Sequence, residues 1–206
     1  MQLIGMMDSP FVRRVAISMA VLGMPFEHRS VSVFRHVDQF REINPVVKAP
    51  TFIDDDGTQL IDSSLVLDYL DHCVAPQARL MPQESAARRR ALHFIGFALA
   101  ACEKSVQIVY ERNLRPQEKQ HGPWLDRVHT QLAAAYQTLE QGVAGVGAQS
   151  WLCGDRLMQP DITVAVAWRF TQHSLPDAID PGRYPALTAL SRRAEALPEF
   201  AGAPLE

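Results

Sequence analysis

The stretch from residue 45 to residue 64 constrains the fold of this chain more than any other. Two short apolar runs, 51–53 and 59–61, are separated by three aspartates, a glycine and a threonine, and Asp-Gly between apolar runs is typical of a β-hairpin turn. Asp62 and the two serines after it precede an apolar helical pattern, and Asp and Ser are favoured N-cap residues. The stretch therefore predicts a hairpin followed directly by a helix over about 63–74.

The residues around Pro50 indicate a binding role for this hairpin. Pro50 stands where a strand begins and has no N–H for a sheet ladder, and an X-Pro bond at such a place is a candidate for the cis form. The backbone of Ala49 would then face outward and pair with an extended peptide, as an added strand does. A helix N-terminus at Asp62-Ser63 favours a carboxylate, and Lys48 adds a cation nearby. Together these features suit a small peptide with anionic ends.

The segments that flank this stretch predict an α/β arrangement. Ser9-Pro10 pairs a favoured N-cap with a favoured first helical residue. A parallel pair of strands joined by a helix argues for an α/β layer structure. The expected order is a strand (2–6), a helix (from 10 to about 23), a strand (26–33), a short helix (38–43), the hairpin and the final helix.

The second half of the chain predicts helices alone. A proline-punctuated linker spans 77–83, and beyond it no strand pattern returns. We expect a first domain over 1–76 and an all-helical domain over 84–206. Residues 162–170 are apolar on nearly every side, which predicts a buried central helix. Apolar spacings of three and four predict further helices with faces Leu92, Ile95, Leu99, Cys102, Val106, Val109; Leu125, Val128, Leu132, Tyr136, Leu139, Val143; and Tyr184, Leu187, Leu190, Ala194, Leu197.

Composition excludes several classes of function. The 206 residues are 47% hydrophobic and carry a net charge of −3, so nothing predicts binding to nucleic acid or to an anionic membrane. Three widely spaced cysteines show no CxxC or zinc spacing, which favours a reduced, cytoplasmic protein without a metal site. No apolar run approaches the ~20 residues of a membrane span, and the N-terminus lacks the pattern of a signal peptide.

The binding stretch resembles the glutathione-binding half of the glutathione S-transferase family. The family pattern is Asn-Pro, a basic residue, a small β-branched residue, proline, a hairpin, then Glu or Asp followed by Ser. Here it stands as Asn44-Pro45, Lys48, Ala49-Pro50 and Asp62-Ser63. Ala49 replaces the Val or Ile that the family often has, so some packing is lost.

Two further motifs extend the resemblance over essentially the whole chain. Residues 9–15, Ser-Pro-Phe-Val-Arg-Arg-Val, resemble the opening of the first helix in serine-type bacterial members. Residues 154–162 resemble the family's buried capping motif, in which a Ser or Thr cap is followed three residues later by Asp. Asp161 is present, but Met158 occupies the hydroxyl position, so the reciprocal cap is half missing.

The resemblance implies a thioredoxin-like βαβαββα domain followed by an all-α domain. It implies a homodimeric transferase that uses glutathione as co-substrate, without a metal, and attacks a small apolar electrophile. Ser9 would be the catalytic residue, because a hydroxyl hydrogen bond and a helix N-terminus both favour the thiolate, which is the nucleophile. The implied glutathione-binding residues are His36, Lys48, Ala49, Pro50, Asp62 and Ser63. Among these, Asp62 would hold the α-amino group and Ser63 the adjacent carboxylate.

Structural explanations stand beside each of these roles. Ser9, Asp62 and Ser63 are also ordinary capping residues, and Lys48 and His36 are also ordinary surface residues. Arg13 and Arg14 are expected on a solvated or interface face, and Tyr110, Trp168 and Phe170 in the core. A non-catalytic regulatory or binding protein on the same fold is the alternative function. Thioredoxin-like redox activity is disfavoured, because the first helix starts with a serine where a cysteine is required.

Overall fold

Four short strands form one mixed sheet in the order β2-β1-β3-β4. Its central strand β1 pairs in parallel with β2 and antiparallel with β3, which continues into the antiparallel partner β4. The predicted β-α-β-α-β-β-α order is confirmed. The strands are β1 (Gln2–Ile4), β2 (Glu27–Arg29), β3 (Thr51–Ile53) and β4 (Gln59–Ile61).

The second strand is shorter than the predicted range of 26–33. Its ladder with β1 ends at the pair Ile4–Arg29. The chain turns soon afterwards, where the Ser32 hydroxyl oxygen accepts hydrogen bonds from the N–H groups of Phe34 and Arg35 at 3.2 and 3.1 Å. Such a serine turn offers the backbone an alternative to the sheet ladder. The chain then enters α2 (Val37–Ile43).

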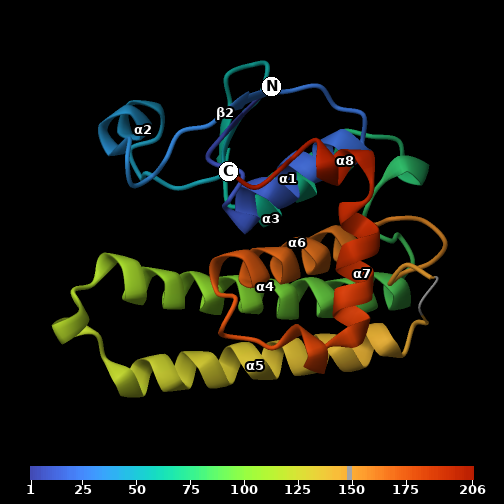
Figure 1. The fold of residues 1–206 in the computed structure, drawn as a ribbon. Coiled ribbons are helices and arrows are strands. Elements are labelled where there is room, and N and C mark those ends of the chain that lie inside the picture. The colour runs from blue at the N-terminus through green and yellow to red at the C-terminus, as the bar shows by residue number, and fades with distance from the viewer. Residues whose placement is uncertain (148–149) are drawn as a thin grey trace. The chain divides into compact units, whose positions relative to one another are not determined.

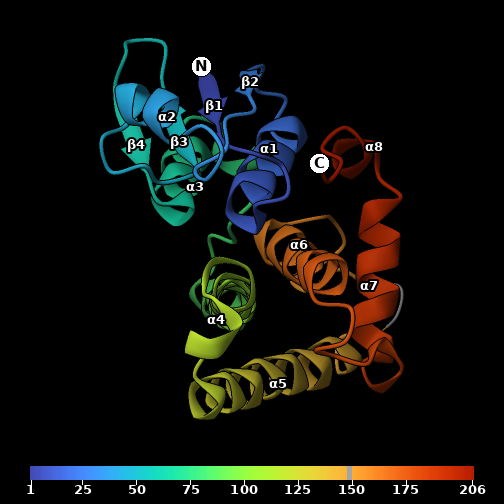
Figure 2. The ribbon, with the colours of Figure 1, turned by 60° about the vertical axis from the view of Figure 1, so that its left-hand side comes forward.

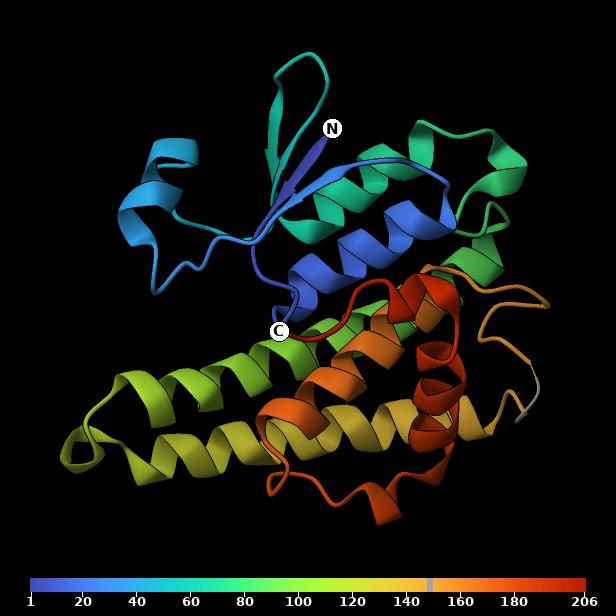
Figure 3. The same cartoon turned by 45° about the horizontal axis from the view of Figure 1, so that its top comes forward.

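Two helices follow strands β1 and β4 in this half of the fold. α1 (Pro10–Val21) is the crossover between the parallel strands, and α3 (Ser63–His72) follows the hairpin. The two helices pack against each other, whereas α2 lies apart from that pair (Figures 1 and 3). A short 3-10 helix, η1 (Pro76–Ala78), follows α3.

The structure is a computed structural model that describes residues 1–147 and 150–206. It divides into one unit of Met1–Met81 with Ala196–Glu206 and a second unit of Pro82–Glu195. The final segment, which contains α8 (Pro198–Ala201), thus belongs to the first unit, whereas the predicted division assigned it to the helical domain. Arg13 explains the difference, because its Nε donates to the carbonyl oxygen of Ala203 at 2.8 Å.

The second unit consists of helices in the part that the structure describes. α4 packs along both α5 and α6, and α7 packs against α6 and α5 (Figure 2). By length and mean hydropathy alone α4 meets a minimal test for a membrane span, which buried core helices also pass. The helices are α4 (Ser85–Leu114), η2 (Gln117–Lys119), α5 (Gly122–Ala144), α6 (Gln159–Ser174), η3 (Pro181–Arg183) and α7 (Pro185–Glu195).

The buried face of α4 agrees with the predicted one in part. Ile95 and Cys102 are buried, but Leu92 is 52% exposed, and the buried positions also include three alanines, Ala91, Ala98 and Ala101. The prediction followed the large apolar side chains and missed these small ones. Tyr110, predicted in the core, is also exposed, and the predicted faces of α5 and of the buried α6 are confirmed except at Leu125, which is partly exposed.

The start of α6 is held by Asp161, the third residue of that helix. Its two oxygens accept hydrogen bonds from the N–H groups of Leu152 at 2.8 Å and Met158 at 2.9 Å. The reciprocal contact, from the amide of Asp161, is to the Met158 side chain, and a thioether sulfur is only a weak acceptor. Burial raises the pKa of the Asp161 carboxyl to about 6, against the opposing effect of these amide donors.

Candidate active site

Ser9 lies at the N-cap of α1, with Pro10 as the first helical residue. Its hydroxyl oxygen accepts a hydrogen bond from the N–H of Val12 at 3.5 Å. A serine hydroxyl has two acceptor lone pairs and one proton to donate. Capping uses a lone pair, so the proton remains available for an anion at the start of the helix. The capping role and the ligand role predicted for Ser9 fit the same geometry.

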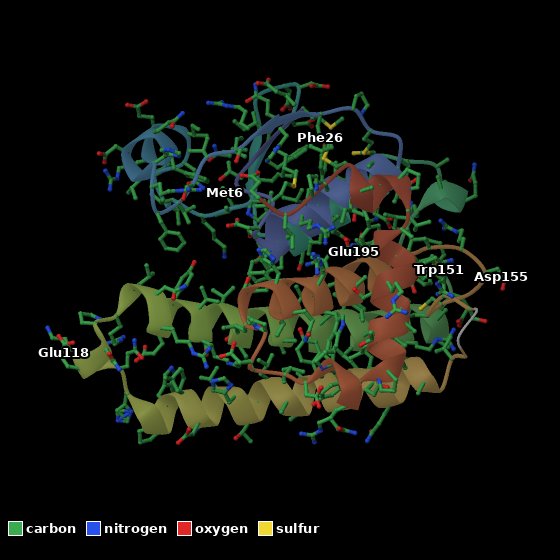
Figure 4. The ribbon with its side chains drawn as sticks, in the orientation of Figure 1. Met6, Phe26, Glu118, Trp151, Asp155 and Glu195 are labelled. Carbon is green, nitrogen blue, oxygen red and sulfur yellow. The ribbon has the colours of Figure 1, made fainter. Side chains whose placement is uncertain are left out.

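The loop that leads to Ser9 is held by residues of the same unit. The N–H of Met7 donates to Oε1 of Glu206 at 3.1 Å, and the Ser30 hydroxyl donates to Oε2 of the same carboxylate at 2.5 Å. The sulfur of Met6, which is labelled in Figure 4, accepts a hydrogen bond from Nη2 of Arg35 at 3.3 Å. These contacts fix the backbone just before the helix start.

Asp62 and Ser63 form the N-terminus of α3. Asp62 is the N-cap, and its Oδ1 accepts from the N–H of Ser64 at 2.9 Å. Its φ of +69° lies in a region that non-glycine residues rarely adopt. Ser63 is 4% exposed, and its hydroxyl oxygen accepts from Nη1 of Arg14 at 3.2 Å. The predicted pair therefore forms a helix start. The backbone of Asp62 is strained, and its carboxylate is partly exposed.

Lys48, Ala49 and Pro50 lead into β3. The Ala49–Pro50 peptide bond is cis, as the sequence suggested, and the ladder with β1 starts only at Thr51. Lys48 is exposed, with its Nζ 3.8 Å from Oδ2 of Asp62. The structure thus places Lys48 beside the N-terminus of α3.

The segment before Pro50 is held by a buried hydrogen-bond network. Asn44 donates from Nδ2 to Oγ1 of Thr51 at 2.9 Å, and that hydroxyl donates to the carbonyl oxygen of Lys48 at 2.8 Å. The Asn44 oxygen accepts from the N–H of Val46 at 2.9 Å. Val47, with a φ of +53°, is strained in the same turn. Strained residues persist only where surrounding structure over-determines them, and they cluster at functional sites; here they flank both predicted binding segments.

Gly5 allows the Ala49 segment to approach α1. A Cβ atom at residue 5 would lie 2.6 Å from Cγ2 of Val12 and 2.9 Å from Cβ of Ala49. Its φ of +135° is a further reason for glycine at this position. The absence of a side chain at residue 5 brings the segment around Ala49 close to the first turn of α1, which Ser9 caps.

His36 is the predicted site residue that the described contacts do not join to the others. It is exposed at the start of α2, and its Nδ1 accepts from the N–H of Ser32 at 3.4 Å. Arg13 and Arg14 were expected on a solvated or interface face, and the solvated face is wrong. Both are only 2% exposed, and Arg14 reaches the α3 serines. The signal for their burial is that α1 carries apolar residues on all sides, which leaves little room for a solvated face.

A separate cavity of about 560 Å³ lies at the start of α4, lined by Glu84, Ala86, Ala87, Arg89, Arg90 and His93. The Glu84 carboxylate already accepts from the N–H groups of Ala86 and Ala87, which lowers the pKa of that carboxyl. This helix end therefore does not offer free amides to an anion. Within the described residues, no group of three or more His, Cys, Asp or Glu is arranged to hold a metal ion.

Comparison with known proteins gives a consistent result for both halves of the chain. A family model described as "Glutathione S-transferase, N-terminal domain" matches residues 3–77, and one described as "Glutathione S-transferase, C-terminal domain" matches residues 122–193. The two models together cover more than half of the chain.

Curated relatives and solved structures agree with these models. A probable maleylacetoacetate isomerase of Vibrio cholerae is 26% identical, over 98% of this chain and 94% of the relative. Probable maleylacetoacetate isomerase 2 of Drosophila melanogaster is 23% identical, over 92% of this chain and 81% of the relative.

Among solved structures, a glutathione S-transferase of Methylobacterium radiotolerans in complex with glutathione sulfonate has a TM-score of 0.90 and 26% identity, over 100% of this chain and 95% of that one. A glutathione transferase family member of Pseudomonas fluorescens with bound glutathione has a TM-score of 0.85 and 26% identity, over 100% of this chain and 98% of that one. With the Ser9-capped α1, the Asp62-capped α3 and the Ala49–Pro50 segment in one unit, these matches show that the chain belongs to the glutathione S-transferase family.

Proposed function

We propose that the chain binds reduced glutathione at the starts of α1 and α3 and uses Ser9 to hold its thiol as thiolate for attack on an apolar electrophile. One observation carries this proposal. Ser9 and Ser63 lie at two helix N-termini of one unit, and each hydroxyl oxygen already accepts from a protein donor, the N–H of Val12 and Nη1 of Arg14. Each hydroxyl therefore has its proton to offer to an anion.

The residues at the start of α3 suit the γ-glutamyl head of glutathione. Asp62 has one oxygen on the Ser64 amide and the other directed to Lys48 at 3.8 Å, so it can accept from the ligand's α-amino group. Ser63 and the first amides of α3 suit the adjacent carboxylate. The backbone of Ala49, which precedes the sheet ladder, suits the cysteinyl residue. Lys48 and His36 are the cations available for the glycine carboxylate.

The chemical step is substitution or addition at carbon. A thiol with a pKa of about 8.5 is only a few per cent thiolate near pH 7, so its stabilisation raises the concentration of the nucleophile. The thiol proton passes to solvent and the sulfur forms a bond to the electrophilic carbon. In substitution a leaving group departs with its bonding electrons; in addition the double-bond electrons move to the neighbouring atom, which takes a proton from solvent. Ser9 keeps its own proton and acts by donating a hydrogen bond to the sulfur.

The proposal includes the setting of the reaction. The electrophile is a small apolar molecule, and the protein acts as a homodimer in the cytoplasm. All three cysteines lie in the described part of the chain and form no disulfide, which supports a reducing compartment. Light scattering at micromolar protein should give the mass of a dimer; a monomer mass would remove that part of the proposal.

The test is calorimetric titration of reduced glutathione into the wild type, Ser63→Ala, Ser9→Ala and the control Ser85→Ala. Ser85 is the first residue of α4 as Ser63 is of α3, so the control removes an equivalent hydroxyl outside the site. We expect Ser63→Ala to weaken binding about tenfold and Ser85→Ala to leave it unchanged. Ser9→Ala should leave affinity nearly unchanged and raise the pKa of the bound thiol by about one unit, seen in thiolate absorbance.

The regulatory alternative makes the opposite prediction. A regulator that has lost the site should give no heat and no thermal shift with millimolar glutathione. Such a result for a folded wild type would reject the transferase proposal and turn attention to protein partners.

Isomerisation is a second candidate reaction, because relatives named probable maleylacetoacetate isomerase align with nearly the whole chain. In that reaction the thiolate would add to a conjugated double bond and leave again after rotation. The two reactions differ in their net consumption of glutathione, because conjugation consumes it and isomerisation regenerates it. Measurement of free thiol during turnover of maleylacetoacetate therefore separates them.

A further inference from the structure

We propose that Arg14 is a positioning residue that fixes the Ser63 hydroxyl as a donor and thereby selects a ligand with a free α-carboxylate at the start of α3. This inference rests on the proposed function and deepens it. It concerns a residue that lies behind the site, on α1, and does not require contact between Arg14 and the ligand.

Arg14 reaches α3 from inside the first unit. Its side chain is 2% exposed, and Nη1 lies 3.2 Å from Oγ of Ser63 and 3.3 Å from Oγ of Ser64. A guanidinium is always charged and has donors but no acceptor. Both serine oxygens must therefore be acceptors in these two hydrogen bonds.

The consequence is a directional preference at Ser63. A serine oxygen that accepts from a buried cation has its own proton turned away from that cation. At the first residue of α3, the amides of the first turn also point out of the helix start. A group that binds there must accept hydrogen bonds, and the positive charge of Arg14 behind the hydroxyl favours an anion.

Asp62 supplies the complementary half of this preference. Its carboxylate, one residue before Ser63, accepts hydrogen bonds and favours an ammonium group. A carboxylate and an ammonium on neighbouring positions are the head group of a free α-amino acid. A peptide linked through the γ-carboxylate of glutamate keeps both groups, whereas one linked through the α-carboxylate does not.

Arg13 provides a matched comparison. It precedes Arg14 on α1 and is equally buried, but it donates to the backbone oxygens of Ala203 at 2.8 Å and Phe200 at 3.4 Å. Its guanidinium also lies 5.8 Å from the centre of the Phe200 ring. Arg13 therefore secures the final segment, and its replacement tests the effect of losing a buried arginine whose described contacts are to that segment.

The experiment compares two ligands on the full-length chain. Calorimetry measures the Kd of glutathione and of 4-aminobutyryl-Cys-Gly, which lacks only the α-carboxylate, for the wild type, Arg14→Gln, Arg14→Lys and Arg13→Gln. We expect Arg14→Gln to weaken the binding of glutathione about tenfold and the binding of the analogue less than about twofold. Arg13→Gln should change the two ligands by the same factor.

Steady-state kinetics with an activated aryl halide gives an independent result. Arg14→Gln should raise the KM for glutathione about tenfold and leave kcat at saturating glutathione within about twofold, because thiolate stabilisation at Ser9 does not pass through Arg14. A loss of kcat with unchanged KM would overturn the proposed role.

The outcomes separate this inference from the proposed function. A wild type that does not bind glutathione overturns both. A wild type that binds, with Arg14→Gln weakening both ligands equally or neither, overturns the role of Arg14 alone. If Arg14→Gln does not fold, Arg14→Lys decides, because it keeps one cationic donor: a loss confined to glutathione supports the role, and equal effects on both ligands reject it.

Discussion

Two helix starts in this molecule, those of α3 and α6, are each organised around an aspartate, but the two carboxylates are used differently. Asp62 is the N-cap of α3, with a half-exposed side chain and one backbone amide bound at 2.9 Å. Asp161 is fully buried at the third position of α6, and both of its oxygens are bound by backbone amides.

The difference shows how one residue type can serve either stability or binding. At α6 the chain itself uses the acceptor capacity of the carboxylate, which holds the buried Leu152 and Met158 in the core. At α3 part of that capacity faces solvent near Lys48, and the backbone is held in a strained conformation. The first arrangement stabilises the fold, and under the proposed function the second leaves a charged group for a ligand.

The largest expected effect comes from Asp161→Ala. The substitution leaves the amides of Leu152 and Met158 buried without their acceptor, at about 1–3 kcal/mol each. We expect the free energy of unfolding at pH 7 to fall by about 3 kcal/mol in denaturant titration. A loss under about 1 kcal/mol would contradict the structural role given to this helix start.

Gly5→Ala tests the close approach between the Ala49 segment and the first turn of α1. The new Cβ would meet Val12 and Ala49 at distances that side chains do not tolerate, in a backbone region unfavourable for L residues. We expect a loss of about 2 kcal/mol in unfolding free energy, measured by thermal and denaturant unfolding. Gly23→Ala is the control, because it shares a positive φ but has no atom within 4 Å of the added Cβ; a similar loss in the control would assign the effect to φ alone.

Asp62→Asn should separate binding from stability. Asn is as good an N-cap as Asp and tolerates positive φ, so the unfolding free energy should change by less than about 0.5 kcal/mol. The missing charge should weaken glutathione binding about tenfold, because a hydrogen bond to a charged group is lost. Asp38→Asn, at the exposed start of α2, is the calorimetric control. A stability loss without an affinity loss would make Asp62 a capping residue only.

A subtler difference is expected in pH dependence. The folded-state pKa of Asp161 is raised to about 6, chiefly by burial, from an ordinary value of 3.8. The stability contributed by its protonated form is therefore full below pH 3.8 and is lost as the pH rises through about 6. The difference in unfolding free energy between the wild type and the non-titrating Asp161→Asn should fall over this range. A flat difference would show that the amide donors balance burial, and a rise with pH would show that they outweigh it.

Local turn and capping chemistry made much of this fold predictable. The hairpin strands 51–53 and 59–61 and the start of α3 at Ser63 match their predicted positions, because Asp-Gly, Asp-Ser and Ser-Pro pairs act on neighbouring residues. The two serines and Asp62 lie at helix starts for the same reason.

Features that depend on tertiary packing were not predicted. The bond from Arg14 to Ser63 joins residues 49 positions apart, and nothing local to either residue encodes it. The buried face of α4 was predicted only in part, because its buried alanines carry little signal in an apolar pattern. His36 shows the converse limit, since a resemblance in sequence assigns it a ligand role that its described contacts do not test.

The attachment of the final segment to Arg13 has a consequence for biosynthesis. A ribosome makes the first unit's sheet and its α1–α3 pair long before it makes Phe200 and Ala203, whose backbone oxygens accept from Arg13. The nascent N-terminal half therefore emerges without two acceptors of a side chain that is buried in the finished protein. Its folding can be completed only after translation has passed through the whole helical unit, so the first part of the chain to be made is among the last to be finished.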